Sequence, residues 1–214
     1  MLRVNLTSKA KLGLKMQDMT LEEKHQQFDE FFMIKHNILV NMRLVADDFE
    51  LPEIDDLLQH MPYEFQIASE LSSIDTKALR PLRGLGEHAI ELAEFLNHQS
   101  RKIDLMMSFV LHQQDEPVHR FKTVKLGGGG VIIESKEAMD VGTKAELKLF
   151  LDAESAAIFC YGEVITCEQV EDSYHIAFIF NSIREKDKEL LVRASLHIQT
   201  QQLRKRSKER KAGS

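Results

Sequence analysis

The sequence predicts an α+β fold, in which a six-stranded antiparallel β-barrel is split by a helical insertion and followed by a C-terminal helix. Two observations predict this fold. Apolar residues recur at every second position in 31–44 and again across 118–181, which is typical of strands with one buried face. Between them, in 50–115, the apolar period changes to three or four residues, which is typical of helices. Hairpin connections favour a closed barrel, because closure removes exposed edges.

The composition is that of a globular, acidic chain with a basic end. The 214 residues are 43% hydrophobic with a formal net charge of −6. The tail, 204–214, holds six basic residues and one acidic residue, so the remainder carries −11. Such a body argues against a dedicated nucleic-acid site, because duplex affinity comes from clustered Lys and Arg. The tail is expected to be a solvated, frayed helix end, with membrane-surface or RNA contact as the alternative.

No stretch reaches the roughly 18 apolar residues of a membrane span, and the N-terminus lacks the apolar region of a secretory signal. A cytoplasmic location is therefore expected. The N-terminal segment, 1–27, contains a capping box at Thr20–Glu23 that predicts a helix near 20–30. From residue 32 the even positions are apolar or His and predict a first strand over 31–44, namely Phe32, Ile34, His36, Ile38, Val40, Met42 and Leu44.

The helical insertion ends in a long helix with a heptad pattern. Short helical pieces are expected first, because Pro52, Pro62, Pro81, Gly84 and Gly86 punctuate the sequence. Between Glu87 and Gln114 there is neither Gly nor Pro. One register places Gln99 and six apolar residues on a and d positions, namely Ala89, Leu92, Leu96, Ile103, Met106 and Val110. This pattern predicts a seam for a dimer or a tetramer; the alternative is a helix that covers the barrel within one protomer.

The alternating pattern returns after Pro117 and predicts five more strands, at 120–126, 130–134, 144–151, 158–167 and 174–180. A second capping box, Ser182–Glu185, predicts a helix over 182–203. Cys160 and Cys167 are seven residues apart in one predicted strand, so their side chains are expected on opposite faces and not to pair.

No local motif indicates an enzyme or a metal site. The nine histidines form no close pair with a carboxylate at ligand spacing, and neither HExxH nor CxxC occurs. The four glycines Gly127 to Gly130 lack the Lys-Ser/Thr and the following helix of a P-loop. Two interpretations stay open: a bulged hairpin turn that uses positive φ angles, or a loop whose backbone N–H groups line a phosphate.

The order of several motifs resembles the PilZ domain family. They are the segment Lys125–Val131, the segment Val141–Leu147, the strand Tyr161–Ile165 and the strand Ile176–Phe180 before a helix. The stretch Leu96–Met107 resembles the long helix of the atypical, tetramer-forming PilZ group. The resemblance covers roughly 28–205 and implies the barrel fold, a non-enzymatic role and cyclic di-GMP as the family's ligand.

The chain departs from both ligand motifs of that family, RxxxR and DxSxxG. Phe31 and Lys35 stand where two arginines are expected. Aligned on Gly130, the Asp position holds Lys125 and the Ser position holds Gly127. Each lost charged contact costs roughly 1.5–3 kcal/mol, so nucleotide binding is expected to be weak or lost.

The resemblance to the atypical group implies an oligomeric adaptor in surface, motility or pilus-related regulation that acts through a protein partner. The alternative is a genuine cyclic di-GMP receptor with a rearranged pocket. In that case Arg120 and Lys122, together with Lys125, or the arginines of the tail, offer a different anion site.

Overall fold

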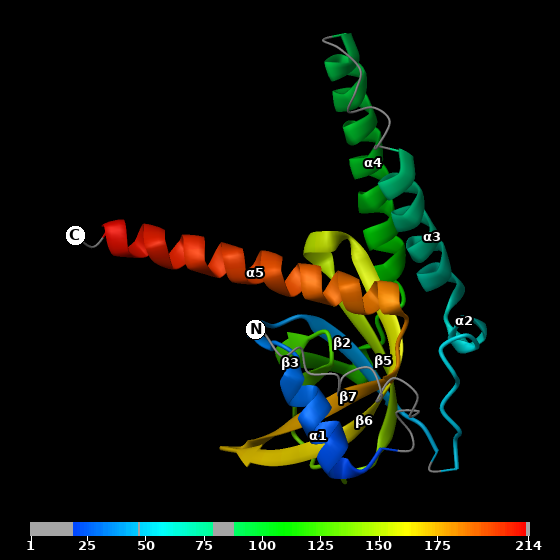
Figure 1. Ribbon diagram of the computed structural model, residues 1–214, viewed down its shortest axis with the longest axis vertical. Coiled ribbons are helices and arrows are strands. Elements are labelled where there is room, and N and C mark those ends of the chain that lie inside the picture. Colours follow the sequence, from blue (N-terminus) through cyan, green and yellow to red (C-terminus); the bar gives the residue numbers. More distant parts are fainter. Residues whose placement is uncertain (1–18, 47, 79–87, 213–214) are drawn as a thin grey trace, which may run out of the picture.

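The computed structural model describes residues 19–46, 48–78 and 88–212, and it has the predicted α+β fold (Figure 1). The predictions at Pro81, Gly84 and Gly86 lie outside these residues. The helices are α1 Leu21–Glu30, α2 Leu57–His60, α3 Tyr63–Ala78, α4 His88–His112 and α5 Glu185–Ala212, with short 3-10 turns η3 Pro117–His119 and η4 Asp152–Glu154. The strands are β1 Ile34–Lys35, β2 Leu39–Leu44, β3 Arg120–Gly127, β4 Gly130–Ser135, β5 Lys144–Leu151, β6 Ala156–Val170 and β7 Ser173–Ser182.

The strands form a closed antiparallel barrel. The order β3-β2-β5-β6-β7-β4 returns to β3 through the β3–β4 pairing, and β1 pairs with β3 as well. The barrel interior is filled by aliphatic and aromatic side chains from every strand, in one cluster that includes Val40, Leu126, Leu147 and Phe178. The predicted six-stranded barrel is therefore confirmed.

The predicted first strand is interrupted. It consists of β1 and β2, which both pair with β3, and 36–38 between them are not in a strand. Thr123 fills the break, because its Oγ1 accepts the N–H of Ile38 at 2.9 Å and donates to the carbonyl of His36 at 2.7 Å. The expected burial of every even position was thus wrong at His36, and also at Phe32 and Leu44, which are 57% and 54% exposed.

The barrel mouth is closed by α5 and not by the insertion. Leu191, Ala194 and Ile198 of α5 belong to the same cluster as the barrel interior. The helix then continues beyond the barrel to Ala212 (Figure 1). The prediction ended it at 203, but Lys and Arg form helices well and are favourable at a helix C-terminus.

The two predicted capping boxes had different outcomes. At α1, Thr20 Oγ1 accepts the N–H of Glu23, and the Glu23 carboxylate accepts the N–H of Thr20. At α5 the box is absent, because Ser182 lies in β7 and donates its hydroxyl proton to the carbonyl of Pro52 at 2.7 Å. The helix begins three residues later than predicted, and the backbone carbonyl of Arg184 accepts the N–H of Lys188.

The insertion packs on the outer wall of the barrel. A second cluster joins residues of α2 and α3, such as Leu57 and Phe65, with Leu111 of α4 and with Phe150 and Phe159 of the barrel. From this base, α3 and α4 rise away from the barrel side by side (Figure 1). The barrel therefore holds α4 near its C-terminal end.

Both cysteines are free, and they face the same side of the sheet. Cys160 is part of the barrel interior and Cys167 packs against it. The prediction of opposite faces was wrong because the β6–β7 register shifts between Val164 and Thr166. A bulge of one residue reverses which side chains point inward.

Candidate functional site

The glycine run forms the hairpin that joins β3 and β4, where Gly127 pairs with Gly130. All four glycines are buried. Among the described residues the glycine with a left-handed φ is Gly142, at 92°, so the predicted use of positive φ angles in 127–130 was wrong. The run must have another reason to lack side chains.

That reason is close contact with other parts of the chain, which include backbone carbonyls as well as aromatic rings; a Cβ atom added to Gly127 would lie 2.5 Å from the carbonyl oxygen of Phe32. A Cβ atom added to Gly129 would overlap the ring of Phe31, and one added to Gly130 would overlap both the carbonyl oxygen of Phe178 and the ring of Phe28. A Cβ on Gly128 would lie 2.9 Å from Cγ2 of Val192 in α5. The rings cover the loop surface on which an exposed phosphate nest would depend.

The helix that carries Phe28 is held to the barrel by a buried ion pair. Lys24 Nζ donates to both carboxylate oxygens of Glu163, at 2.7 and 2.8 Å, and both residues are buried. Asn181 Nδ2 donates to the same carboxylate at 3.0 Å. Sequence reasoning missed Lys24 and Phe28, although their spacing of four residues in a predicted helix places them on one face.

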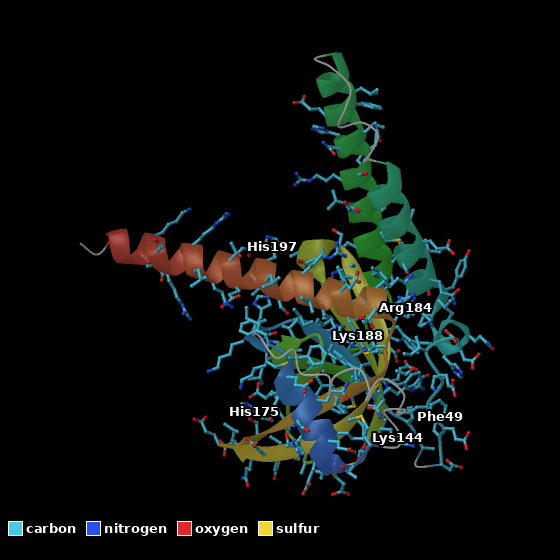
Figure 2. All side chains as sticks on the ribbon, viewed as in Figure 1. Phe49, Lys144, His175, Arg184, Lys188 and His197 are labelled. Carbon is cyan, nitrogen blue, oxygen red and sulfur yellow. The ribbon has the colours of Figure 1, made fainter. Side chains whose placement is uncertain are left out.

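A small cleft lies beside the Phe31 ring, between α1, the glycine loop and α5. Its lining residues are Gln27, Phe31, Gly128, Gly129, Phe180 and Lys188. Lys188 lies near the barrel end of α5 (Figure 2). The cleft has about 190 Å³ of empty space with its mouth included, which is less than the roughly 300–1,000 Å³ of typical ligand pockets.

The structure brings some of the predicted ligand-site residues together. Phe31 lies near the turn between Gly127 and Gly130. Lys35 and Lys125 stand directly opposite each other on β1 and β3. These two lysines therefore place two like charges together at the edge of this region.

Arg120 does not join them. It lies at the start of β3 and forms an ion pair with Asp115, which follows the end of α4 in the chain. Lys122 is exposed and stands opposite Glu134 of β4. The structure thus separates the alternative anion site, because Arg120 is paired with Asp115 at one end of β3 while Lys125 stands opposite Lys35 near the other end.

A polar cluster connects the end of α4 to the barrel wall. Asn41 of β2 is buried; its Nδ2 donates to Asp115 Oδ1 at 2.7 Å, and its Oδ1 accepts the N–H of Glu116 at 2.7 Å. Lys148 Nζ donates to the Glu116 carboxylate at 3.0 Å. The chain segment that leaves α4 is therefore fixed by hydrogen bonds from three strands.

These contacts shift the two carboxyl pKa values downward. Burial raises the pKa of Asp115, but hydrogen bonds from Arg120 and Asn41 outweigh it and leave the pKa below its ordinary value. The hydrogen bond from Lys148 lowers the pKa of Glu116 against the opposing effect of burial. Both groups are thus stabilised as carboxylates in the folded chain.

The predicted heptad seam is largely exposed in the single chain. Leu92 is 49% exposed, Met106 is 62% exposed and Ile103 is 38% exposed. Val110 is also exposed and Leu96 is half-buried, whereas the side chain of Ala89 lies outside the described residues. The side of α4 that packs inward carries Met107 and Leu111, which are buried.

Three further large apolar side chains widen this exposed surface: Phe95, Leu105 and Phe109 are 57%, 63% and 67% exposed. At 100° per residue, the arc from Leu105 to Ile103 covers about 160° of the helix circumference, and the polar residues His98, Gln99 and Lys102 also lie within it. We call this surface, with the seam residues, the α4 apolar face. Large apolar side chains gathered on one exposed helix face are typical of an interaction surface.

In the described part of the chain, no three His, Cys, Asp or Glu side chains are grouped so that they could hold a metal ion. None of the helices within the described ranges is both long enough and apolar enough to span a bilayer.

Three comparisons place this geometry among known proteins. Residues 97–197 match the model of the PilZ domain family. A tetrameric PilZ domain protein of Xanthomonas campestris, self-assembled via a helical bundle, is similar over 84% of this chain and 96% of that chain, with a TM-score of 0.52 and 13% identity. At this identity the likeness shows the fold.

The inhibitor of motility of Bacillus subtilis, MotI/DgrA, is similar over 38% of this chain and 42% of that chain. Its TM-score of 0.36, at 15% identity, is too low to carry an argument. The search of curated proteins gave no match.

Proposed function

Residues 97–197 of the chain form a PilZ domain, and from this premise we propose that the chain is a non-enzymatic regulatory adaptor of bacterial cyclic di-GMP signalling networks. In this proposal it acts in the cytoplasm as a homo-oligomer, regulates a surface, motility or pilus-related process, and binds a protein partner. The barrel and its insertion, 28–205, work as one unit, preceded by the segment 1–27 and followed by the tail 204–214.

The observation that carries the proposal is the α4 apolar face. An exposed heptad stripe is the surface that helices bury when they associate. Its apolar side chains spread over about 160° of α4, with His98, Gln99 and Lys102 among them, which is wider than the a and d seam of a two-helix contact and favours two neighbours for each α4. We therefore expect a tetramer in preference to a dimer. The related Xanthomonas campestris protein is a tetramer built through a helical bundle, which supports this expectation.

Weak or absent nucleotide binding is the second part of the proposal. Phe31 replaces a guanidinium group by an uncharged ring, and the ring covers the glycine loop. The adjacent cleft is too small for a cyclic dinucleotide without a rearrangement of α1. Regulation then passes through protein contacts and does not require a nucleotide or another cofactor.

The second candidate is a genuine cyclic di-GMP receptor with a rearranged pocket. It is favoured by the opposed pair Lys35 and Lys125 and by Lys188 in the cleft, since phosphates attract such cations. In that case α1 must move to admit the ligand.

Sedimentation velocity at micromolar concentration tests the first proposal, and isothermal titration with cyclic di-GMP separates the two candidates. We expect a species larger than a monomer and no saturable heat. A monomer would overturn the adaptor seam, whereas saturable heat that persists in Phe31→Ala would favour the receptor.

A further inference from the structure

The last turns of α5 form a basic arm, which we define as residues 203–212. Near the start of the arm, Gln202 ties α5 to the barrel wall by a hydrogen bond from its Nε2 to the carbonyl of Lys35 at 2.9 Å. From Leu203 to Glu209 every side chain is exposed. The arm holds six basic residues and one acidic residue, a net charge of +5. Ten helical residues extend it about 15 Å.

A segment of opposite charge lies between β2 and α2. We define the acidic segment as residues 48–56, which contain five carboxylates and neither Lys nor Arg, a net charge of −5. All five carboxylate side chains are exposed, and Ile54 and Leu58 beside them are 51% and 48% exposed. The segment has a fixed position, because Lys144 Nζ donates to the carbonyl of Phe49 at 3.1 Å (Figure 2).

The arm and the acidic segment of one chain lie on opposite sides of the molecule. In Figure 1 the end of α5 projects to the left, whereas the segment before α2 lies at the lower right. The helix α5 is continuous from Glu185 to Ala212, so the arm cannot turn back without breaking it. The two charged surfaces can therefore meet when they belong to different molecules.

We propose that the basic arm of one chain docks on the acidic segment of a second copy. The charges are equal and opposite, and Leu203 of the arm, 57% exposed, has apolar counterparts in Ile54 and Leu58. Nucleic acid is a poorer partner, because the remaining body carries −11 and repels a polyanion. A lipid surface is a poorer partner, because the arm after Leu203 offers no apolar face to insert. The contact is separate from the α4 seam and does not depend on it.

Zero-length carbodiimide cross-linking of a mixture of ¹⁴N- and ¹⁵N-labelled full chains tests the contact. The reagent joins a lysine amine to a carboxylate that it touches, and mass spectrometry reads both residues and both isotopes. We expect mixed-isotope cross-links from Lys205 and Lys208 to 48–56, about tenfold fewer near 0.5 M NaCl because salt screens the charges.

Charge reversal gives the control. We expect Arg204→Glu with Arg206→Glu, or Asp55→Lys with Asp56→Lys, to reduce the mixed cross-links about tenfold, and mixing the two reversed chains to restore them. Reversal of two acidic residues elsewhere, Glu171→Lys with Asp172→Lys, should leave them unchanged.

Three outcomes would overturn the contact. They are same-isotope cross-links only, a cross-link yield that salt does not change, and salt-sensitive binding of the arm to duplex DNA or to anionic vesicles while the cross-links are absent. A variant whose seam is broken, Leu92→Glu with Met106→Glu, should keep the cross-links even if it sediments as a monomer, so failure of the seam and failure of the arm contact are distinguishable.

Discussion

Two surfaces of this molecule that could hold a partner differ in how the chain treats them. The glycine loop is covered by Phe28 and Phe31 of the N-terminal region, while the α4 apolar face is left open. The rings of Phe28 and Phe31 pack on the glycine loop and make it part of the packed interior. The second surface has no such cover within the described residues. The comparison shows that the chain packs its own side chains on the glycine loop and leaves the α4 apolar face open.

The largest expected effect comes from placing charge on the open surface. In Leu92→Glu with Met106→Glu, both side chains are exposed in the single chain, so the fold should remain while the assembly dissociates to monomers, because a seam cannot bury eight carboxylates in a tetramer. Sedimentation velocity and circular dichroism measure the two properties. The matched control is Val118→Glu with Val141→Glu, at valines that are 88% and 49% exposed away from α4. Equal loss of assembly in the control would contradict a specific seam.

The next largest effect is expected at the buried ion pair between Lys24 and Glu163, which holds α1 beside the glycine loop. Lys24→Met leaves the Glu163 carboxylate buried with Asn181 alone, and we expect it to lower the free energy of unfolding by about 3–5 kcal/mol. Lys24→Met with Glu163→Leu should recover most of this loss, because no unpaired charge remains. Urea unfolding measures both. Equal stability of the single and double variants would mean that the pair does not hold the cover in place.

A smaller effect tests whether the aromatic cover is what excludes side chains from the loop. Gly129→Ala should lower the free energy of unfolding by about 1–3 kcal/mol, since its Cβ overlaps the Phe31 ring. In the Phe31→Ala background the same substitution should cost close to nothing. The double-mutant cycle isolates the interaction between the two residues. Additive losses would show that some other neighbour requires the glycine.

The smallest effect concerns Asp115, which holds the segment that leaves α4 near the base of the α4 apolar face. Because the pKa of Asp115 in the folded chain lies below its ordinary value of 3.8, the stabilisation is present above that value and is lost as pH falls through the lower folded pKa. Asp115→Asn should lower the free energy of unfolding by about 1–2 kcal/mol at pH 7, and this difference should narrow toward pH 2. Urea unfolding at both pH values measures it. A constant difference would assign the loss to packing and not to charge.

The sequence predicts the parts of this fold that depend on period. Alternation in β5 and β7 and the heptad pattern in α4 each identified an element, because each depends on which face of that element is buried. Features that depend on a neighbour were not predictable. The break at 36–38 depends on hydrogen bonds from the backbone to Thr123, which is 85 residues from Ile38. The register shift near Thr166 arises from pairing with β7.

The candidate site shows the same division. The glycine run was visible in the sequence, but Phe28 and Phe31, whose rings lie against it, precede it by about a hundred residues, and no local pattern links the two. Ser182 was assigned to a helix cap because of its local sequence, yet its hydroxyl bonds to Pro52 in the insertion. In both cases the contact is made by a distant part of the chain, and the sequence around the glycine run or around Ser182 does not indicate it.

One continuous helix, α5, both closes the barrel mouth with Leu191, Ala194 and Ile198 and extends past it as the basic arm. Mechanically this is a lever whose short end is embedded in the barrel. A force applied to the free end is transmitted along the helix axis to the residues that close the barrel mouth. A partner that binds the arm therefore also pulls on the interior of the domain.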